Sequence, residues 1–116
     1  MHVAFDIDGT LDADPVLMGT LLRDLMNGAN RISILTGSSA KIPNKKDAQD
    51  KINYLRSLGM DPFWDTVVII GDPPHAAKAE WCKNNHVDIL FDNSVQNAKL
   101  AAKHCLVMLP WNTKQD

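Results

Sequence analysis

The chain has 116 residues, of which 45% are hydrophobic, and a formal net charge of −2. This length predicts one domain spanning residues 1–116, with room for about five strands and their helices. The small net charge gives no global electrostatic reason to expect nucleic acid or a membrane surface as a partner. No apolar stretch approaches the roughly 20 residues that span a bilayer.

Two further features bear on the compartment. Asp6 and Asp8 interrupt the first apolar run, so no signal peptide is expected there. The chain has two cysteines, Cys82 and Cys105, and in a protein of this size they favour buried thiols in a reducing compartment over a disulfide. We therefore expect a cytoplasmic protein without a membrane partner.

Short apolar runs, typical of buried strands, alternate with amphipathic segments, typical of helices. Strands are predicted at residues 2–5, 31–35, 66–70, 87–91 and 105–109, and helices at 15–27, 45–58, 75–85 and from 93 or 94 to about 103. Asp14 before Pro15 is a favourable N-cap, and Gly28 and Gly59 fit helix ends. The polar residues 37–44 predict a loop, and the tail from Pro110 is expected to be loose.

This alternation predicts an α/β fold. Continuous apolar strands suit a sheet buried on both faces, and right-handed crossovers then give a doubly wound, Rossmann-like parallel sheet of about five strands in a three-layer sandwich. Ligands bind beyond the carboxyl ends of the strands in such sheets. Three of those ends carry polar residues here: Asp6 with Asp8, then Thr36, then Asp92 with Asn93.

The first of these strand ends has the residues that phosphoryl transfer requires. Two carboxylates so close together, Asp6 and Asp8, suit Mg²⁺, which prefers oxygen ligands. One carboxylate can attack phosphorus to form an aspartyl-phosphate, and the other can protonate the leaving oxygen and then deprotonate water. Gly9 allows a sharp turn that aims Asp8 and backbone N–H groups at the phosphate. An ordinary turn after a strand is the alternative interpretation.

The segment Phe5-Asp6-Ile7-Asp8-Gly9-Thr10-Leu11 resembles the first motif of the haloacid dehalogenase (HAD) superfamily of aspartate-nucleophile phosphohydrolases. The resemblance implies that Asp6 is the nucleophile and Asp8 the general acid and base. It also implies that the Asp6 carboxylate and the Asp8 backbone carbonyl hold Mg²⁺. Thr10 would support the position of Asp8, and we place it in the substrate-binding set with Gly37 and Lys78.

The second and third motifs of the superfamily have candidates in the expected order. Thr36, followed by Gly37, would donate a hydrogen bond to the transferring phosphoryl group. Lys78 would offset the repulsion between Asp6 and the phosphate. Lys83 is the competitor for this role but lies late in its helix, and a solvated helix lysine remains the alternative for both.

The fourth motif is acidic, and Asp92 fits it as the third metal ligand. The superfamily usually has a second acid beside it or a few residues on, where this chain has Asn93 and Asn97. An amide can orient a metal-bound water or bind weakly through its carbonyl oxygen, but it adds no negative charge, so this departure is expected to weaken Mg²⁺ binding or alter the metal preference.

The resemblance also bears on the substrate. The segments 11–14 and 71–74 run straight into helices, so neither can hold the cap domain of many relatives. Open sites in the superfamily often serve large substrates, and others close by oligomerisation. Lys41, Lys45 and Lys46 form either a small basic patch for a second phosphate or a solubilising helix start. His75 shares a helix face with Lys78 and either touches the substrate or is an ordinary surface histidine.

Together these features predict a capless Mg²⁺-dependent phosphatase. Its substrate would be a small phosphorylated molecule or an exposed phosphate on a macromolecule. Two alternatives stay open: a nucleotidase or nucleic-acid-end phosphatase of the same superfamily, and a non-catalytic protein that binds phosphate and metal.

Overall fold

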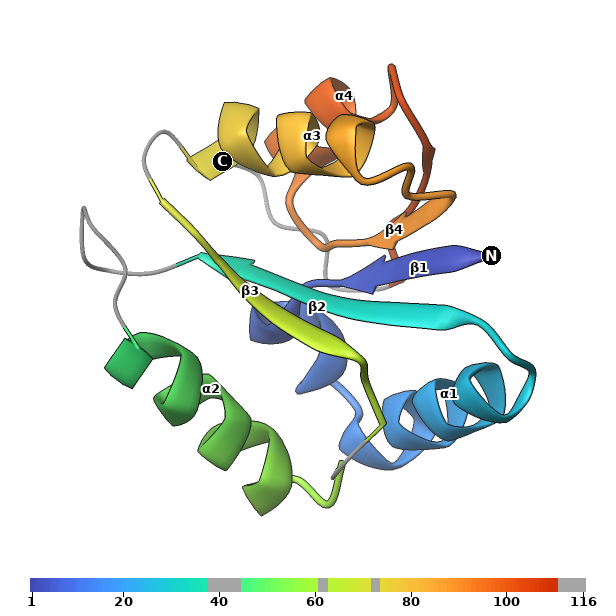
Figure 1. Cartoon of the computed structure of the whole chain (residues 1–116), viewed down its shortest axis with the longest axis vertical. Coiled ribbons are helices and arrows are strands. Elements are labelled where there is room, and N and C mark those ends of the chain that lie inside the picture. The colour runs from blue at the N-terminus through green and yellow to red at the C-terminus, as the bar shows by residue number, and fades with distance from the viewer. Residues whose placement is uncertain (38–44, 61–62, 72–73, 111–116) are drawn as a thin grey trace.

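A five-stranded, all-parallel sheet with the strand order β3-β2-β1-β4-β5 forms the centre of the computed structural model (Figure 1). The strands are β1 (His2–Phe5), β2 (Arg31–Gly37), β3 (Thr66–Ile70), β4 (Ile89–Phe91) and β5 (Leu106–Met108). The structure describes residues 1–37, 45–60, 63–71 and 74–110, without the side chain of Lys45. The predicted α/β fold with a parallel sheet of about five strands is therefore confirmed.

Helices cover both faces of this sheet. Figure 1 shows α1 (Pro15–Asn27) and α2 (Lys45–Ser57) on one side, and α3 (Pro74–Asn84) and α4 (Val95–Ala101) on the other. Side chains along β1 alternate between the two layers, because successive residues of a strand point to opposite faces. Val3 and Phe5 pack in one core cluster with Leu22 of α1, whereas Ala4 packs in the other with Cys82 of α3.

Two strands are shorter than the sequence predicts. The predicted strands at 87–91 and 105–109 are reduced to β4 and β5. The N–H of Val87 donates to Cys82 O at 3.0 Å and that of Cys105 donates to Ala101 O at 3.1 Å. Both N–H groups therefore close the turn after a helix and do not join the sheet ladder. Conversely, β2 runs two residues further than predicted, because Thr36 and Gly37 pair with β3.

The helix bounds differ from the predictions by small amounts. Helix α1 coincides with its prediction, and Asp14 caps it by accepting from the N–H of Leu17. Helix α3 begins and ends one residue earlier than predicted, and α4 ends at Ala101, where the prediction reached about residue 103. Within the part of the chain that the structure describes, none of the helices has the length and apolar character that crossing a membrane requires.

The strand order reverses direction between β1 and β4, which are neighbours in the sheet although far apart in sequence. Open α/β sheets bind ligands at such a switch point, beyond the carboxyl ends of the strands. Here β1 leads into η1 (Ile7–Leu11), a tight turn in which Asp8 and Gly9 have non-helical backbone angles. Gly9 within it has a φ of 74°, the left-handed region that favours glycine. The candidate site therefore lies beside an unusual turn.

Candidate active site

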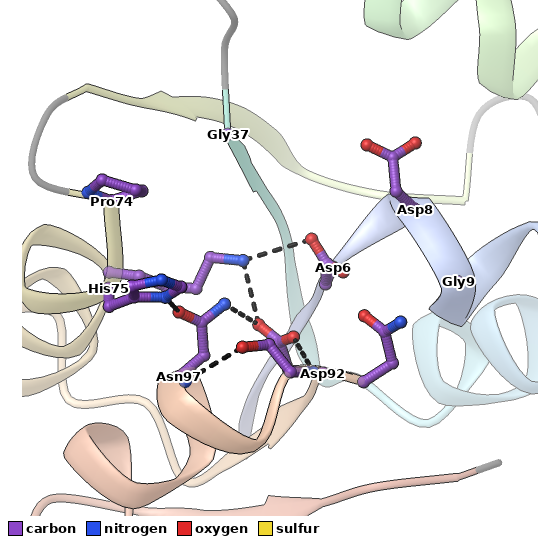
Figure 2. Close-up of a pocket in the computed structure, with 11 residues that line it drawn as sticks. Asp6, Asp8, Gly9, Gly37, Pro74, His75, Asp92 and Asn97 are labelled. Carbon is purple, nitrogen blue, oxygen red and sulfur yellow. Dashed lines mark hydrogen bonds and ion pairs between the residues drawn. The ribbon is translucent and has the colours of Figure 1, made fainter. Parts of the chain in front are cut away.

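A cavity of about 380 Å³ opens at this switch point, and its lining includes Asp6, Asp8, His75, Lys78, Asp92 and Asn93. These residues come from the end of β1, from α3 and from the segment that follows β4. Figure 2 shows how their side chains lie. The topology thus brings together most of the residues that the sequence singled out.

Asp6 lies at the floor of the cavity, directly after β1. Its backbone N–H donates to Phe91 O at 2.9 Å, which ties it to the end of β4. Its side chain is buried, and its Oδ1 accepts from Lys78 Nζ at 3.1 Å. Burial raises the pKa of the Asp6 carboxyl to about 6 from its ordinary value of 3.8, although the charge of Lys78 opposes this shift.

Lys78 lies on α3 and bridges two carboxylates. Its Nζ donates to Asp6 Oδ1 and, at 2.9 Å, to Asp92 Oδ2. Burial alone lowers the pKa of Lys78, but the charges of Asp6 and Asp92 outweigh this effect and raise it. Lys78 therefore carries its charge inside the cavity wall. Lys83, the alternative that the sequence offered, is exposed on the same helix.

Asp92 is fully buried and has donors on both carboxylate oxygens. Oδ1 accepts from the N–H of Ser94 at 2.9 Å, and Oδ2 accepts from Lys78 and, at 2.9 Å, from Asn97 Nδ2. The sequence proposed Asp92 as a metal ligand. The structure places it beside Asp6 on the side of Lys78, where its charge holds the ammonium group.

Asn93 lies on the other side of Asp6. In the orientation that gives the amide hydrogens acceptors, its nitrogen donates to Asp6 Oδ2 at 3.3 Å and to the backbone oxygen of Asp8 at 3.0 Å. These are the two groups that the HAD resemblance assigned to Mg²⁺. A Cβ on Gly9 would clash with the other end of the Asn93 amide, which is its oxygen in this orientation, so the amide fits there only because residue 9 is glycine.

The Asp8 carboxylate extends away from Asp6 and Asp92 (Figure 2). Its side chain is 75% exposed, and its Oδ2 lies 3.9 Å from Lys51 Nζ on α2. The backbone carbonyl of Asp8 points the other way, toward Asn93. The sequence analysis expected Gly9 to aim this carboxylate back at the phosphate, whereas here it lies at the rim of the cavity.

The two threonines differ in their surroundings. Thr10 is fully buried, and its hydroxyl donates to Asp6 Oδ2 at 3.5 Å, so it contacts the predicted nucleophile and not Asp8. The hydroxyl of Thr36 is buried without a hydrogen-bond partner among the described residues. Gly37, the next residue, lines the cavity. An unpaired buried hydroxyl is costly, but the residues that line the cavity include Gly37 and not Thr36.

His75 lies one turn before Lys78 on α3 and also lines the cavity. Its Nδ1 is hydrogen-bonded to Asn97 Oδ1, and Asn97 in turn donates to Asp92. His75 is therefore connected through two side chains to the Lys78 bridge. The sequence placed it on the correct helix face but gave no indication of this connection.

The sequence did not indicate a role for three residues near the site, namely Asp12, Lys51 and Tyr54. The N–H of Gly9 donates to Asp12 Oδ1 at 2.7 Å, and Tyr54 OH of α2 donates to Asp12 Oδ2 at 2.8 Å. Together with Lys51 these contacts attach α2 to the turn that carries Asp8. The only sequence signal was the spacing of Lys51 and Tyr54, which places them on one helix face.

Some of the predicted residues fall outside the described part of the chain or are not among those that line this cavity. Lys41, the side chain of Lys45 and the tail after Pro110 fall outside the described residues, and Lys46 is exposed. Cys82 and Cys105 are both free thiols. Burial raises the pKa of Cys82 to about 12, so it stays protonated at neutral pH.

Oxygen atoms from Asp6 and Asp8 are the candidate ligands for Mg²⁺ in this cavity. Within the described ranges, no three side chains of His, Cys, Asp or Glu are grouped as a metal site. A carboxylate oxygen of Asp6 and the carbonyl oxygen of Asp8 nevertheless converge on one atom, the Asn93 amide nitrogen. Two oxygens that share a donor in this way suit a hard cation with water completing its shell. The residues therefore fit Mg²⁺ through a carboxylate oxygen, a backbone carbonyl oxygen and, with the Asn93 amide turned, its oxygen.

Fold and site define an α/β protein with a buried Asp–Lys–Asp cluster at the switch point of a parallel sheet. Comparison with known proteins adds no narrower class. No protein-family model matches the chain, and no curated protein is significantly similar to it.

Proposed function

We propose that this protein is a Mg²⁺-dependent phosphohydrolase that cleaves phosphate monoesters through an aspartyl-phosphate on Asp6. It would be a minimal, capless relative of the HAD superfamily with that superfamily's doubly wound three-layer sandwich. One observation carries the proposal. Asp6 is a buried carboxylate at a cavity floor, with Oδ1 on the Lys78 ammonium and Oδ2 toward Asn93 and the Asp8 carbonyl.

The two oxygens of Asp6 support different roles. Oδ2 faces the Asp8 carbonyl across the Asn93 amide, which is the side that would hold Mg²⁺. That leaves Oδ1 as the nucleophile. Since Lys78 Nζ already lies 3.1 Å from Oδ1, its charge would stabilise the transferring phosphoryl group where negative charge gathers. Mg²⁺, when bound, would neutralise phosphate charge and bring the phosphorus near Oδ1.

The remaining steps use Thr36, which is buried beside the cavity-lining Gly37, and Asp8 at the cavity rim. The unpaired hydroxyl of Thr36 would donate to a phosphoryl oxygen. Asp8 would turn from Lys51 into the cavity, protonate the leaving oxygen as its bond to phosphorus breaks, and then take a proton from water. That water attacks phosphorus and releases inorganic phosphate, which regenerates the Asp6 carboxylate. We propose a cytoplasmic location and an exposed phosphate, on a small molecule or a macromolecule, as the substrate.

A panel of phosphate monoesters that includes nucleotides and 5′-phosphorylated oligonucleotides, assayed with MgCl₂, tests this proposal. Parent protein should turn over at least one ester, Asp6→Asn should lose turnover, and Asp8→Asn should lose about 100-fold or more. Asp24→Asn, an exposed change of the same kind on α1, is the matched control and should behave as the parent.

Two results would contradict the proposal. Folded Asp6→Asn protein that turns over as fast as the parent would remove Asp6 as nucleophile. Binding of Mg²⁺ and beryllofluoride without turnover on any ester would instead indicate a non-catalytic phosphate-binding protein.

A further inference from the structure

The amide of Asn93 lies between two oxygen acceptors, one from the Asp6 carboxylate and one from the Asp8 backbone carbonyl. In the orientation that gives the amide hydrogens acceptors, Asp6 Oδ2 lies 3.3 Å and the Asp8 carbonyl oxygen 3.0 Å from its nitrogen, and the residue is 8% exposed. The Asp6 carboxylate is buried and carries a full negative charge when ionised, and the Asp8 carbonyl oxygen carries a partial one. Without a donor or a cation between them they would repel each other.

Other donors near these two oxygens do not replace the amide. Thr10 Oγ1 reaches Asp6 Oδ2 only at 3.5 Å, and Lys78 is engaged with Asp6 Oδ1 and Asp92. The turn at Gly9, with its φ of 74° and no Cβ, leaves space that the Asn93 amide fills. The backbone is therefore shaped to admit this side chain between the two acceptors.

We propose that Asn93 is a built-in substitute for the cation, an inference that rests on the proposed function. Its amide hydrogens join Asp6 Oδ2 to the Asp8 carbonyl while metal is absent. When Mg²⁺ enters, the amide must turn and present its carbonyl oxygen. The site is thus folded without metal and exchanges one neutral donor for a divalent cation.

The charge that an acid would add at position 93 explains why an amide is found there. Aspartate at position 93 would add a third carboxylate to Asp6 and Asp92, with one ammonium, Lys78, among them. Such a cluster would bind Mg²⁺ more tightly but would be repulsive without it. With asparagine at position 93 the site binds Mg²⁺ less tightly, but it keeps its folded arrangement without the metal.

Asn93→Asp and Asn93→Ala test the inference, with Asn53→Asp as the matched control. Asn53 is exposed on α2 and accepts from Gln49 Nε2 at 2.9 Å, a bond that aspartate retains. Mg²⁺ affinity is measured by calorimetric titration with MgCl₂, and the melting temperature is measured in EDTA. Neither readout requires a substrate.

Asn93→Asp should bind Mg²⁺ at least about tenfold more tightly than the parent. In EDTA both Asn93 variants should melt below the parent, and saturating Mg²⁺ should raise the melting temperature of Asn93→Asp more than that of the parent. Asn53→Asp should match the parent in both measurements. Parental Mg²⁺ affinity in Asn93→Asp, no binding by any variant, or metal-free Asn93 variants as stable as the parent would each overturn the inference.

A measurement on the parent protein covers the case in which Asn93→Asp does not fold. The side-chain NH₂ resonances of Asn93, identified as those lost in Asn93→Ala, should exchange slowly in EDTA and shift on titration with MgCl₂. Resonances that stay unchanged through saturation would contradict the turn of the amide. Loss of turnover in Asp6→Asn remains a separate test of the proposed function, so the two ideas can fail independently.

Discussion

Lys78 Nζ lies 3.1 Å from Asp6 Oδ1, an ion pair between residues 72 positions apart that joins helix α3 to the end of β1. The same nitrogen holds Asp92 at 2.9 Å. One buried ammonium therefore balances two buried carboxylates. The first prediction follows from this arrangement.

Replacing Lys78 by methionine should lower the free energy of unfolding by about 3–5 kcal/mol, because it leaves two carboxylates buried without a partner. Lys83→Met, on the exposed part of the same helix, should change it by less than about 0.5 kcal/mol. Urea unfolding near neutral pH in EDTA measures both values. Equal stability of the two variants would show that the bridge does not hold the cluster together.

The stability of Asp6→Asn should depend on pH in a defined direction. Since the pKa of Asp6 is raised to about 6 from 3.8, the unfolded chain loses this proton first as the pH rises. The contribution of Asp6 to stability is therefore present below about pH 4 and lost as the pH passes about 6, a difference of about 3 kcal/mol. Asn cannot ionise and keeps that stability.

Metal-free Asp6→Asn should accordingly unfold at higher urea than the parent near pH 8 and at similar urea near pH 4. All other carboxyl groups are common to both proteins, so the difference between them isolates Asp6. A gap that stays constant across this range would mean that the Asp6 pKa is not raised.

Gly9→Ala should destabilise the protein by about 2 kcal/mol or more, because a Cβ at a φ of 74° is strained and would clash with Asn93. Gly37→Ala is the control for stability, since its Cβ would meet no atom of the described residues within 4 Å. In the Asn93→Ala background the cost of Gly9→Ala should shrink toward the backbone strain alone. Thermal unfolding of the four combinations of Gly9 and Asn93 variants, beside Gly37→Ala, gives the coupling. If the stability effects of the Gly9 and Asn93 substitutions simply add, the Asn93 amide does not lie against residue 9.

Tyr54 offers a direct test of the contact between α2 and the turn that carries Asp8. Its hydroxyl donates to Asp12, and this hydrogen bond raises the pKa of the phenol above its ordinary value of 10.0. It is the only tyrosine in the chain, so ultraviolet titration reports it alone. The midpoint should lie above that ordinary value in the parent and move toward it in Asp12→Ala. The same midpoint in both proteins would contradict the contact.

The sequence predicted the regions whose signals are local. Helix α1 was predicted correctly because Asp14 and Pro15 mark its start and Gly28 its end. The short forms of β4 and β5 could not be predicted, because the N–H groups of Val87 and Cys105 close turns after helices. Hydrophobic periodicity does not show whether such an N–H group joins the sheet or closes the turn after a helix.

The candidate site was likewise predicted from the sequence only in part. Asp6 and Lys78 were expected to meet because parallel strands and their crossovers place strand ends and helix starts at one edge of the sheet. The sequence indicated Asn93 as an amide in place of a second acid, with at most a weak role at the metal. Its contact with the Asp8 carbonyl depends on the backbone of Gly9, which composition and spacing do not report.

The most direct test of the central claim is a search for phosphate on Asp6 itself. Parent protein turning over a phosphate ester with MgCl₂ is quenched in acid, digested and examined by mass spectrometry for a phosphoryl group on the peptide that contains Asp6. We predict a phosphorylated Asp6 that disappears in Asp6→Asn together with turnover. Turnover without any phosphoryl group on that peptide, and undiminished in Asp6→Asn, would contradict the claim.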